Sequence, residues 1–410
     1  MEVWMKGLIY VLLFTALAFT FFLSTASAEP ARKKAGVTVY FPNWNISSNS
    51  RNSVDNLPWD RLDFINHAFW KVVPQDGGFA VVSTDPWADT DPENPAAHFP
   101  RYAACAKDHP GTKILLSIGG WTDSGCFSEM ALTKESRMSF IQSCLDTLDK
   151  YPFLSGLDID WEYPGVARDP ENESDEGNPV VGNDRMNYTL LLKELREALD
   201  EHFGAGKRIL TVCAGASVSY SLCMQDYALL HPYVDRINLM TYDMAGPWEN
   251  RTGHHTALLG DNSAERAVKY LLDQGVPAEK IAIGSPLYSH GWKMNKPVQE
   301  TVGAAAEPLD SGDLSWHELL PMEQAAVPEG TPGWHTGYDK EKEAAWLWND
   351  DPASDDYLTF YTYDSTVSLE AKLAYINTHG LGGLIVWQVH GDSMDNGWPM
   401  ITQMHSAFLP

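Results

Sequence analysis

The chain has 410 residues, of which 44% are hydrophobic, and its 55 acidic and 29 basic side chains give a formal net charge of -26. A chain of this length and composition buries a large core, which excludes an intrinsically disordered protein. Because a strongly acidic surface repels phosphate backbones, we expect no nucleic-acid partner.

The first residues, 1–28, differ from the rest of the chain. Lys6 precedes an apolar run of 17 residues, and the segment ends at Ala28, just before Glu29. This order is typical of a secretory signal peptide cleaved after Ala28. The alternative is an uncleaved membrane anchor, since the run is near the lower limit for a spanning helix. We expect cleavage, a secreted mature chain of residues 29–410, and no membrane association afterwards.

Beyond this segment, short β-rich runs alternate with amphipathic stretches of helical spacing, such as 134–150 and 186–203. Most of the β-rich runs are apolar throughout, as expected for strands buried on both faces of a parallel sheet. This alternation predicts an α/β fold, a (β/α)8 TIM barrel, with a doubly wound sheet as the alternative. The eight expected strands cover residues 36–41, 62–70, 113–120, 154–162, 208–214, 234–243, 280–287 and 380–388.

The spacing between strands breaks down before the last one. Residues 293–360 are rich in Pro, Gly, Trp and acidic residues and lack a clear helical period. We therefore expect an inserted subdomain at 293–360. Loops at the carboxyl ends of barrel strands build the active sites of this fold, so the insertion would form one wall of a cleft. We expect no appended domain after the last helix.

Three acidic residues stand two apart in the fourth expected strand. Asp158, Asp160 and Glu162 alternate with apolar residues in the run GLDIDWEYPG. Alternate side chains of a strand point to the same face, so the three carboxylates share one side. Like charges at this spacing are unfavourable unless one carboxyl keeps its proton. This arrangement suits an acid catalyst.

The run SGLDIDWEYPG also resembles the D-x-x-D-x-D-x-E signature of glycoside hydrolase family 18, to which many chitinases belong. Three further stretches resemble motifs of the same family in the same order: LLSIGGW at 115–121, MTYD at 240–243 and GGLIVWQVHGD at 382–392. The resemblance extends from the first expected strand to the last. It implies a TIM barrel with an α+β insertion before the eighth strand.

The resemblance implies a chitinase that hydrolyses β-1,4-linked N-acetylglucosamine polymers with retention of configuration. Its partner would be chitin or chito-oligosaccharides, it would need no cofactor or metal, and we expect a monomer. Glu162 would be the general acid and then the base. The substrate's own 2-acetamido oxygen would attack the anomeric carbon, with Asp160 holding the acetamido N–H and Tyr242 donating its hydroxyl to the group. The implied catalytic residues are Glu162, Asp160, Asp158 and Tyr242.

The resemblance also implies a set of substrate-binding residues. Trp387 would form an apolar floor for a sugar, although Tyr40 and Phe69 could equally fill the barrel. Indoles just beyond strand ends, among them Trp121, could stack on successive sugars or simply pack. The full implied set is Met240, Asp243, Trp387, Tyr40, Phe69, Trp121 and Tyr288, and the other indoles considered are Trp44, Trp248 and Trp292.

Two positions depart from the family pattern. Ser155 stands where the signature has its first Asp, a residue that by resemblance shares a proton with Asp158. Because Ser cannot carry the charge, we expect a shifted pH profile rather than an inactive protein. Tyr288 is followed by Ser289 and His290 where the family often has Gly-Arg, so no binding arginine is expected there.

Metal and disulfide signals are weak. The five cysteines cannot all pair and have no zinc-type spacing, although an exported chain could form one or two disulfides. His254 and His255 are adjacent, which seldom suits one metal. The acidic run 168–184 lacks the spacing of an EF-hand, so we expect a solvated loop.

Two other functions stay open. An endo-β-N-acetylglucosaminidase acting on N-glycan cores would share the same motifs. A non-catalytic chitin-binding lectin would use the same barrel but typically lacks the catalytic acid, whereas Glu162 is present here. The expected aromatic cleft and the insertion favour chitin.

Overall fold

The computed structural model describes residues 35–46, 53–309 and 313–409, so the expected signal peptide lies outside the described residues. Eight parallel strands close into a barrel because the first strand pairs with both the second and the last. The TIM barrel is thus confirmed, and the doubly wound alternative is excluded. In order around the barrel the strands are β1 (Gly36–Pro42), β2 (Phe64–Gln75), β4 (Lys113–Gly119), β5 (Leu154–Asp160), β6 (Ile209–Gly215), β7 (Arg236–Met240), β8 (Ile281–Pro286) and β14 (Gly383–Trp387).

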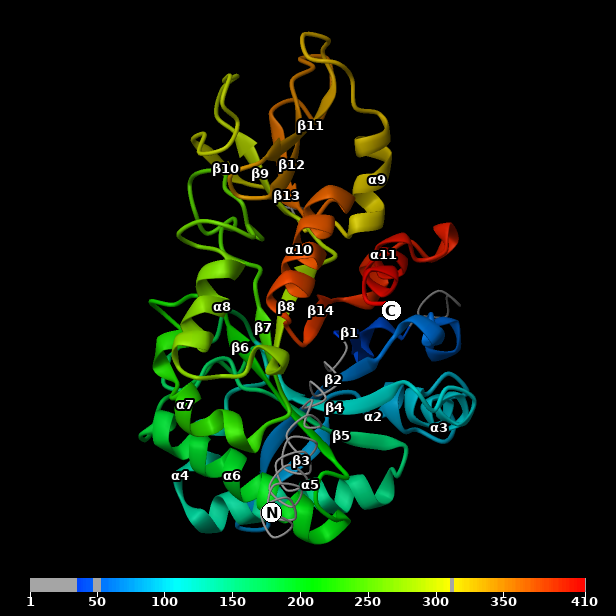
Figure 1. Cartoon of the computed structure of the whole chain (residues 1–410), viewed down its shortest axis with the longest axis vertical. Coiled ribbons are helices and arrows are strands. Elements are labelled where there is room, and N and C mark those ends of the chain that lie inside the picture. Colours follow the sequence, from blue (N-terminus) through cyan, green and yellow to red (C-terminus); the bar gives the residue numbers. More distant parts are fainter. Residues whose placement is uncertain (1–34, 47–52, 310–312, 410) are drawn as a thin grey trace, which may run out of the picture. The chain divides into compact units, whose positions relative to one another are not determined.

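Helices follow most strands and surround the barrel (Figure 1). Polar residues cap the two longest helices: Thr133 and Ser136 form a capping box at the start of α5, and the Asn183 side chain caps α6. The helices are α2 (Pro86–Asp89), α3 (His98–Asp108), α4 (Phe127–Leu132), α5 (Lys134–Lys150), α6 (Asp184–Phe203), α7 (Tyr227–Leu230), α8 (Ala264–Asp273), α10 (Thr366–His379) and α11 (Pro399–Ala407).

Two separate apolar clusters follow from the alternation of side chains along the strands. Leu157, Ile159 and Trp161 point outward and join the large cluster between the strands and the helices. The intervening residues of the strands point into the barrel, where a smaller cluster lies at the level of the acidic residues of β5. Its members are Tyr40, Ala68, Phe69, Cys213, Met240, Tyr242, Ala282 and Ile385.

One hairpin is absent from the sequence prediction. β2 turns back at Asp76 and Gly77 into β3 (Gly78–Ser83), which pairs with it antiparallel. Both turn residues have positive φ, 52° and 79°, as a two-residue type I′ hairpin turn requires. The Asp-Gly pair at positions 76 and 77 is the sequence signal that could have predicted this hairpin.

A second sheet lies in the chain between β8 and β14. Figure 1 shows its strands grouped with α9 (Trp316–Gln324) in the yellow and orange part of the chain. The chain segment that carries this sheet runs from His290 to Tyr363. Each of its ends lies three residues outside the segment 293–360 expected from the sequence. The five antiparallel strands run in the order β10 (Ala306–Pro308), β9 (His290–Met294), β13 (Thr359–Tyr363), β12 (Ala344–Asn349) and β11 (Trp334–Asp339).

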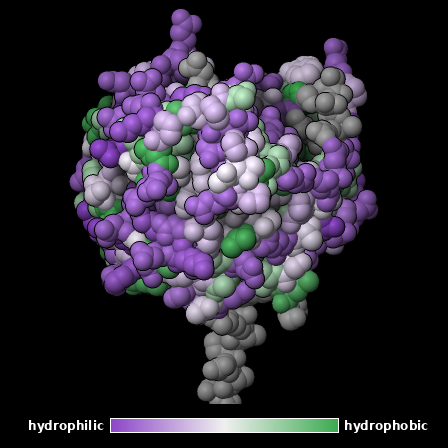
Figure 2. All heavy atoms as spheres, turned by 90° about the horizontal axis from the view of Figure 1, so that it is seen from above, coloured by the Kyte–Doolittle hydropathy of each residue, from purple (hydrophilic) through white to green (hydrophobic). Residues whose placement is uncertain are grey.

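The visible surface in Figure 2 is mostly hydrophilic, with hydrophobic residues scattered over it. Among the described residues, none of the helices combines the length and the apolar character that crossing a membrane would require. All five cysteines are unpaired, so the disulfides considered from the sequence are not formed.

Candidate active site

Asp158 lies fully buried inside the barrel and joins five strands. Its Oδ2 accepts hydrogen bonds from the hydroxyls of Tyr40 on β1, at 2.9 Å, and Ser117 on β4, at 2.8 Å. Its Oδ1 accepts from the Thr211 hydroxyl on β6, at 2.5 Å, and from the Asn238 amide on β7, at 3.0 Å. Both oxygens are thus held, so the position of this carboxylate is fixed by the barrel itself.

Cys213 on β6 belongs to the same group. Its Sγ lies 2.8 Å from the Tyr40 hydroxyl and 3.7 Å from Oδ2 of Asp158. Burial, together with the charge of Asp158, raises the pKa of the thiol well above its usual value, so Cys213 stays neutral. The sequence offered no signal for this role.

Asp160 and Glu162 complete the acidic group predicted from the sequence. Burial, followed by the charges of Glu162 and Asp158, raises the pKa of Asp160 well above its ordinary value. Burial of the Glu162 carboxyl, with a smaller contribution from the charge of Asp243, raises the pKa of Glu162 to about 7. Among the described residues, Oδ1 of Asp160 has no hydrogen-bond partner. The group therefore has a proton to donate near neutral pH and one oxygen free to accept.

Ser155 does not belong to this group. It lies in a bulge at the start of β5, because Leu154 and Gly156 pair with consecutive residues of β4 and leave it out of register. Three residues along a strand separate it from Asp158 by roughly 10 Å. The donors to Asp158 come from the other strands instead. The structure therefore does not show position 155 as a partner of Asp158, and the shifted pH profile expected from the serine stays a prediction.

Tyr242, Met240 and Asp243 meet at the carboxyl end of β7. Tyr242 and Met240 are buried, and the Tyr242 ring packs against the ring of Tyr288, with 6.1 Å between centroids. Oδ1 of Asp243 accepts from the Tyr288 hydroxyl at 2.5 Å and lies 2.8 Å from Nε2 of His290. The structure thus brings these four predicted residues together and adds His290, for which the sequence predicted no role.

Trp387 ends β14 beside other aromatic side chains. Its ring stacks on Phe69, with 5.7 Å between centroids and 17° between planes, and lies 5.7 Å from the ring of Tyr40. Trp387 also lines a cavity of about 380 Å³ together with Asp243 and Tyr288. The three aromatic residues predicted at strand ends therefore form one cluster beside this cavity.

The four tryptophans that the sequence places just beyond strand ends differ in their exposure to solvent. Trp44, Trp121 and Trp248 are 54%, 36% and 65% exposed, as a platform for a sugar requires. Trp292 is fully buried and packs against Phe360 in the core of the second sheet. Trp292 therefore cannot stack on a ligand.

The acidic loop after β5 is not simply solvated as expected. Arg168 lies over the Trp121 ring, 4.0 Å from its centroid, and pairs with the buried Asp175 carboxylate, 2.9 Å from its Oδ1. Hydrogen bonds from Arg168 lower the pKa of Asp175 to about 2. The loop thus holds Trp121 at the rim of the barrel, a role that sequence spacing could not reveal.

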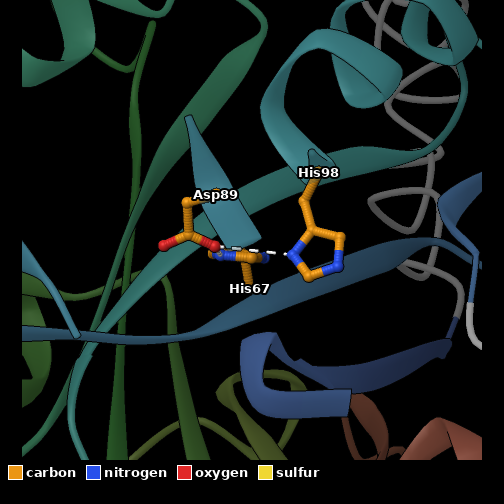
Figure 3. A group of neighbouring side chains, drawn as sticks. All are labelled: His67, Asp89 and His98. Atoms are coloured by element: carbon orange, nitrogen blue, oxygen red, sulfur yellow. Dashed lines mark hydrogen bonds and ion pairs between the residues drawn. The ribbon is translucent and has the colours of Figure 1, made fainter. Parts of the chain in front are cut away.

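A cluster of metal-ligand type lies in the core (Figure 3): His67 on β2, Asp89 on α2 and His98 on α3. Oδ1 of Asp89 lies 2.7 Å from Nε2 of His67 and 3.5 Å from Nδ1 of His98. Its Oδ2 accepts hydrogen bonds from Trp70, Asn43 and Ser83. These donors satisfy both oxygens, and structural zinc sites usually have four ligands where three stand here. We interpret the cluster as a hydrogen-bonded network that fastens α2 and α3 to β2.

Asp89→Asn should lower the free energy of unfolding by about 3 kcal/mol. The amide replaces one accepting oxygen with an N–H donor, and that donor would face the buried donors that the Asp89 carboxylate now binds. Urea unfolding measures the loss. The same substitution at Asp108, which is exposed, is the matched control and should change stability by less than about 0.5 kcal/mol. Equal stability of the two variants would contradict the structural role of Asp89.

The sequence comparisons agree with this geometry. Residues 36–392 match the family described as Glycosyl hydrolases family 18. Chitinase A1 of Niallia circulans is 30% identical, with 93% of this chain and 60% of the relative covered. Chitinase A of Pseudoalteromonas piscicida is also 30% identical, with 77% and 43% covered. The chain therefore spans about half the length of these two relatives.

A solved structure resembles the fold closely. The group IV chitinase of Ostrinia furnacalis in complex with allosamidin has a TM-score of 0.76 at 25% identity, covering 91% of this chain and 98% of that one. The family match runs from the first barrel strand past the last, through the acidic group of β5 and the Trp387 cluster. The chain therefore belongs to glycosyl hydrolase family 18.

Proposed function

We propose that this protein is a secreted, monomeric chitinase that hydrolyses β-1,4 linkages between N-acetylglucosamine units with retention of configuration. The observation that carries the proposal is the acidic group of β5: Glu162 has a pKa of about 7 and stands next to Asp160, inside the barrel of a family 18 chain. A carboxylic acid with that pKa is protonated in weakly acidic solution and loses its proton easily. The chitinase names of the relatives support the choice of polymer.

In the first step Glu162 protonates the glycosidic oxygen and the bond to the anomeric carbon breaks. The acetamido oxygen of the same sugar attacks that carbon and forms a cyclic oxazolinium ion. Asp160 accepts the acetamido N–H through Oδ1, the oxygen that has no partner among the described residues. The carboxylate that Glu162 becomes on donating its proton, together with the neighbouring acids Asp158 and Asp160, then balances the positive charge of the ring.

In the second step water opens the oxazolinium ring. Glu162, now a carboxylate, takes a proton from the water as it attacks the anomeric carbon, so the acid is regenerated. Two attacks on opposite faces leave the product in the original β configuration.

Tyr242 and Trp387 hold the sugar in this account. Burial raises the pKa of Tyr242 well above its usual value, so it stays a hydroxyl that can donate to the acetamido oxygen. The Trp387 indole offers an apolar surface to the C–H face of the sugar. The exposed indoles of Trp44, Trp121 and Trp248 would carry neighbouring sugars of a linear polymer.

These exposed indoles favour a linear polymer over the N-glycan core that an endo-β-N-acetylglucosaminidase would bind. One assay separates the two: incubation with chitin oligomers and, separately, with a high-mannose glycoprotein, followed by mass analysis of the products. We expect shorter N-acetylglucosamine oligomers and no released glycan. Release of the glycan without cleavage of the oligomers would favour the alternative. A lectin would bind the oligomers and leave both substrates uncut.

We expect kcat/KM for chito-oligomers to fall as the pH rises through about 7. The pKa of Glu162 is raised to about 7, so the free enzyme holds the transferable proton below that pH and loses it above. Initial rates at low substrate concentration, measured across neutral pH, give the profile. A kcat/KM that stays level from about pH 6 to about pH 8 would contradict the assignment of Glu162 as the acid.

A further inference from the structure

His290, the first residue of β9, lies between two carboxylates. Its Nε2 is 2.8 Å from Oδ1 of Asp243, and its Nδ1 is 2.8 Å from Oδ1 of Asp313. A neutral imidazole has one N–H and could donate to only one of them, whereas the imidazolium donates to both. Burial alone would lower the pKa of His290, but its bonds to Asp243 and Asp313 raise it to about 9. His290 is therefore a cation at neutral pH.

Asp243 depends on this cation for its position. The backbone of Asp243 has a φ angle of 58°, in the left-handed region that residues other than glycine seldom occupy. Its Oδ1 is held by His290 and the Tyr288 hydroxyl. Although burial opposes it, the neighbouring rings of His255 and His290 keep the pKa of Asp243 well below its usual value. The carboxylate is thus charged and oriented mainly by its neighbours.

This pair faces the proposed substrate. Asp243 and His290 both line the cavity of about 380 Å³ that Trp387 also lines. Asp243, His255 and His290 lie close enough together to suggest a metal. An imidazolium that donates from both nitrogens has no lone pair for a metal ion, so the structure favours a hydrogen-bonded relay instead.

We propose that His290 is a positioning residue for substrate binding: as a cation tethered by Asp313, it holds the Asp243 carboxylate against the sugar seated on Trp387. This inference rests on the proposed function. An arginine in this place would stay charged at any working pH, but a histidine does not. In this chain, substrate affinity should therefore be lost in alkaline solution, when His290 becomes neutral.

Other titratable groups facing His290 come from three segments. Asp243 and His255 follow β7, Tyr288 follows β8, and Asp313 precedes α9. Burial lowers the pKa of His255 to about 4 and raises that of Tyr288 well above its usual value. Within this set, His290 is the group that changes charge near pH 9.

The test measures binding of an N-acetylglucosamine hexamer by calorimetry in the full chain carrying Glu162→Gln, which removes cleavage and the titration of Glu162. We expect a Kd that is constant to about pH 8 and about tenfold weaker at about pH 10, because the competent fraction falls in proportion. His290→Asn should bind weakly at every pH. His290→Arg should bind tightly and should still do so at about pH 10, because arginine keeps its charge there. If His290 only filled space, restoring the charge with arginine would not restore binding.

Asp313→Asn gives an independent variant, because the Asp313 side chain is 66% exposed and its loss leaves the core intact. Without this tether the alkaline loss of binding should begin at lower pH. The inference is overturned by a Kd that does not change up to about pH 10, by an Asp313→Asn profile that does not shift, or by tight binding to His290→Asn. If the parent binds no chito-oligomer at any pH, the proposed function fails and this inference with it.

Discussion

Glu162→Gln should remove nearly all hydrolysis of chito-oligosaccharides while the fold and oligomer binding persist. The amide keeps the shape of the carboxyl but has no proton to deliver to the leaving oxygen. General acid and base catalysis is worth roughly 10²- to 10⁴-fold in rate, and Glu162 would serve in both steps, so a loss at the upper end is expected. Initial rates on oligomers measure it, and calorimetry with the hexamer checks binding.

The matched control is Glu129→Gln, since Glu129 is exposed on α4 and lies outside the acidic group of β5. This variant should keep the full rate. If Glu162→Gln kept more than about a tenth of the parent rate, another group would have to be the acid.

Fully deacetylated chitosan should not be cleaved, although it has the same β-1,4 backbone as chitin. Its glucosamine units lack the acetamido oxygen that acts as the nucleophile, and in this account the protein supplies no nucleophile of its own. Asp160 and Tyr242 would then surround a group that is absent. Cello-oligomers, which carry a hydroxyl at that carbon, should be equally inert. New reducing ends after long incubation measure cleavage, and their steady release from either substrate would argue against attack by the acetamido group.

The barrel could be predicted from the sequence because its signals are local. Apolar runs such as that of β4 are short, β-rich and separated by helical stretches, so each strand is recognisable without knowledge of its partners. The acidic residues of β5 alternate with Leu157, Ile159 and Trp161, which places them inside the barrel once those side chains pack outward. The hairpin of β3 carried an equally local signal at Asp76 and Gly77, which the wider alternation of strands and helices obscured.

The partners of the site could not be predicted, because they depend on closure of the barrel. Ser117, Thr211 and Asn238 are ordinary polar residues of three strands, and they meet only when those strands stand around Asp158. At Ser155 the sequence suggested a contact that the structure does not show. Its place in the signature suggested a partner for Asp158, but Ser155 lies in a bulge, three residues before that carboxylate along the strand. His290 likewise gains its role from two acids that lie 47 and 23 positions away in the chain.

The most direct test of acetamido attack beside Glu162 uses partly acetylated chitosan. Fresh products are separated by anomer, and their new reducing ends are sequenced. We predict that the β-anomer forms first and that every new reducing end is N-acetylglucosamine, because only an acetylated sugar can donate its anomeric carbon to the reaction. An initial α-anomer, or glucosamine at the new reducing ends, would contradict the mechanism.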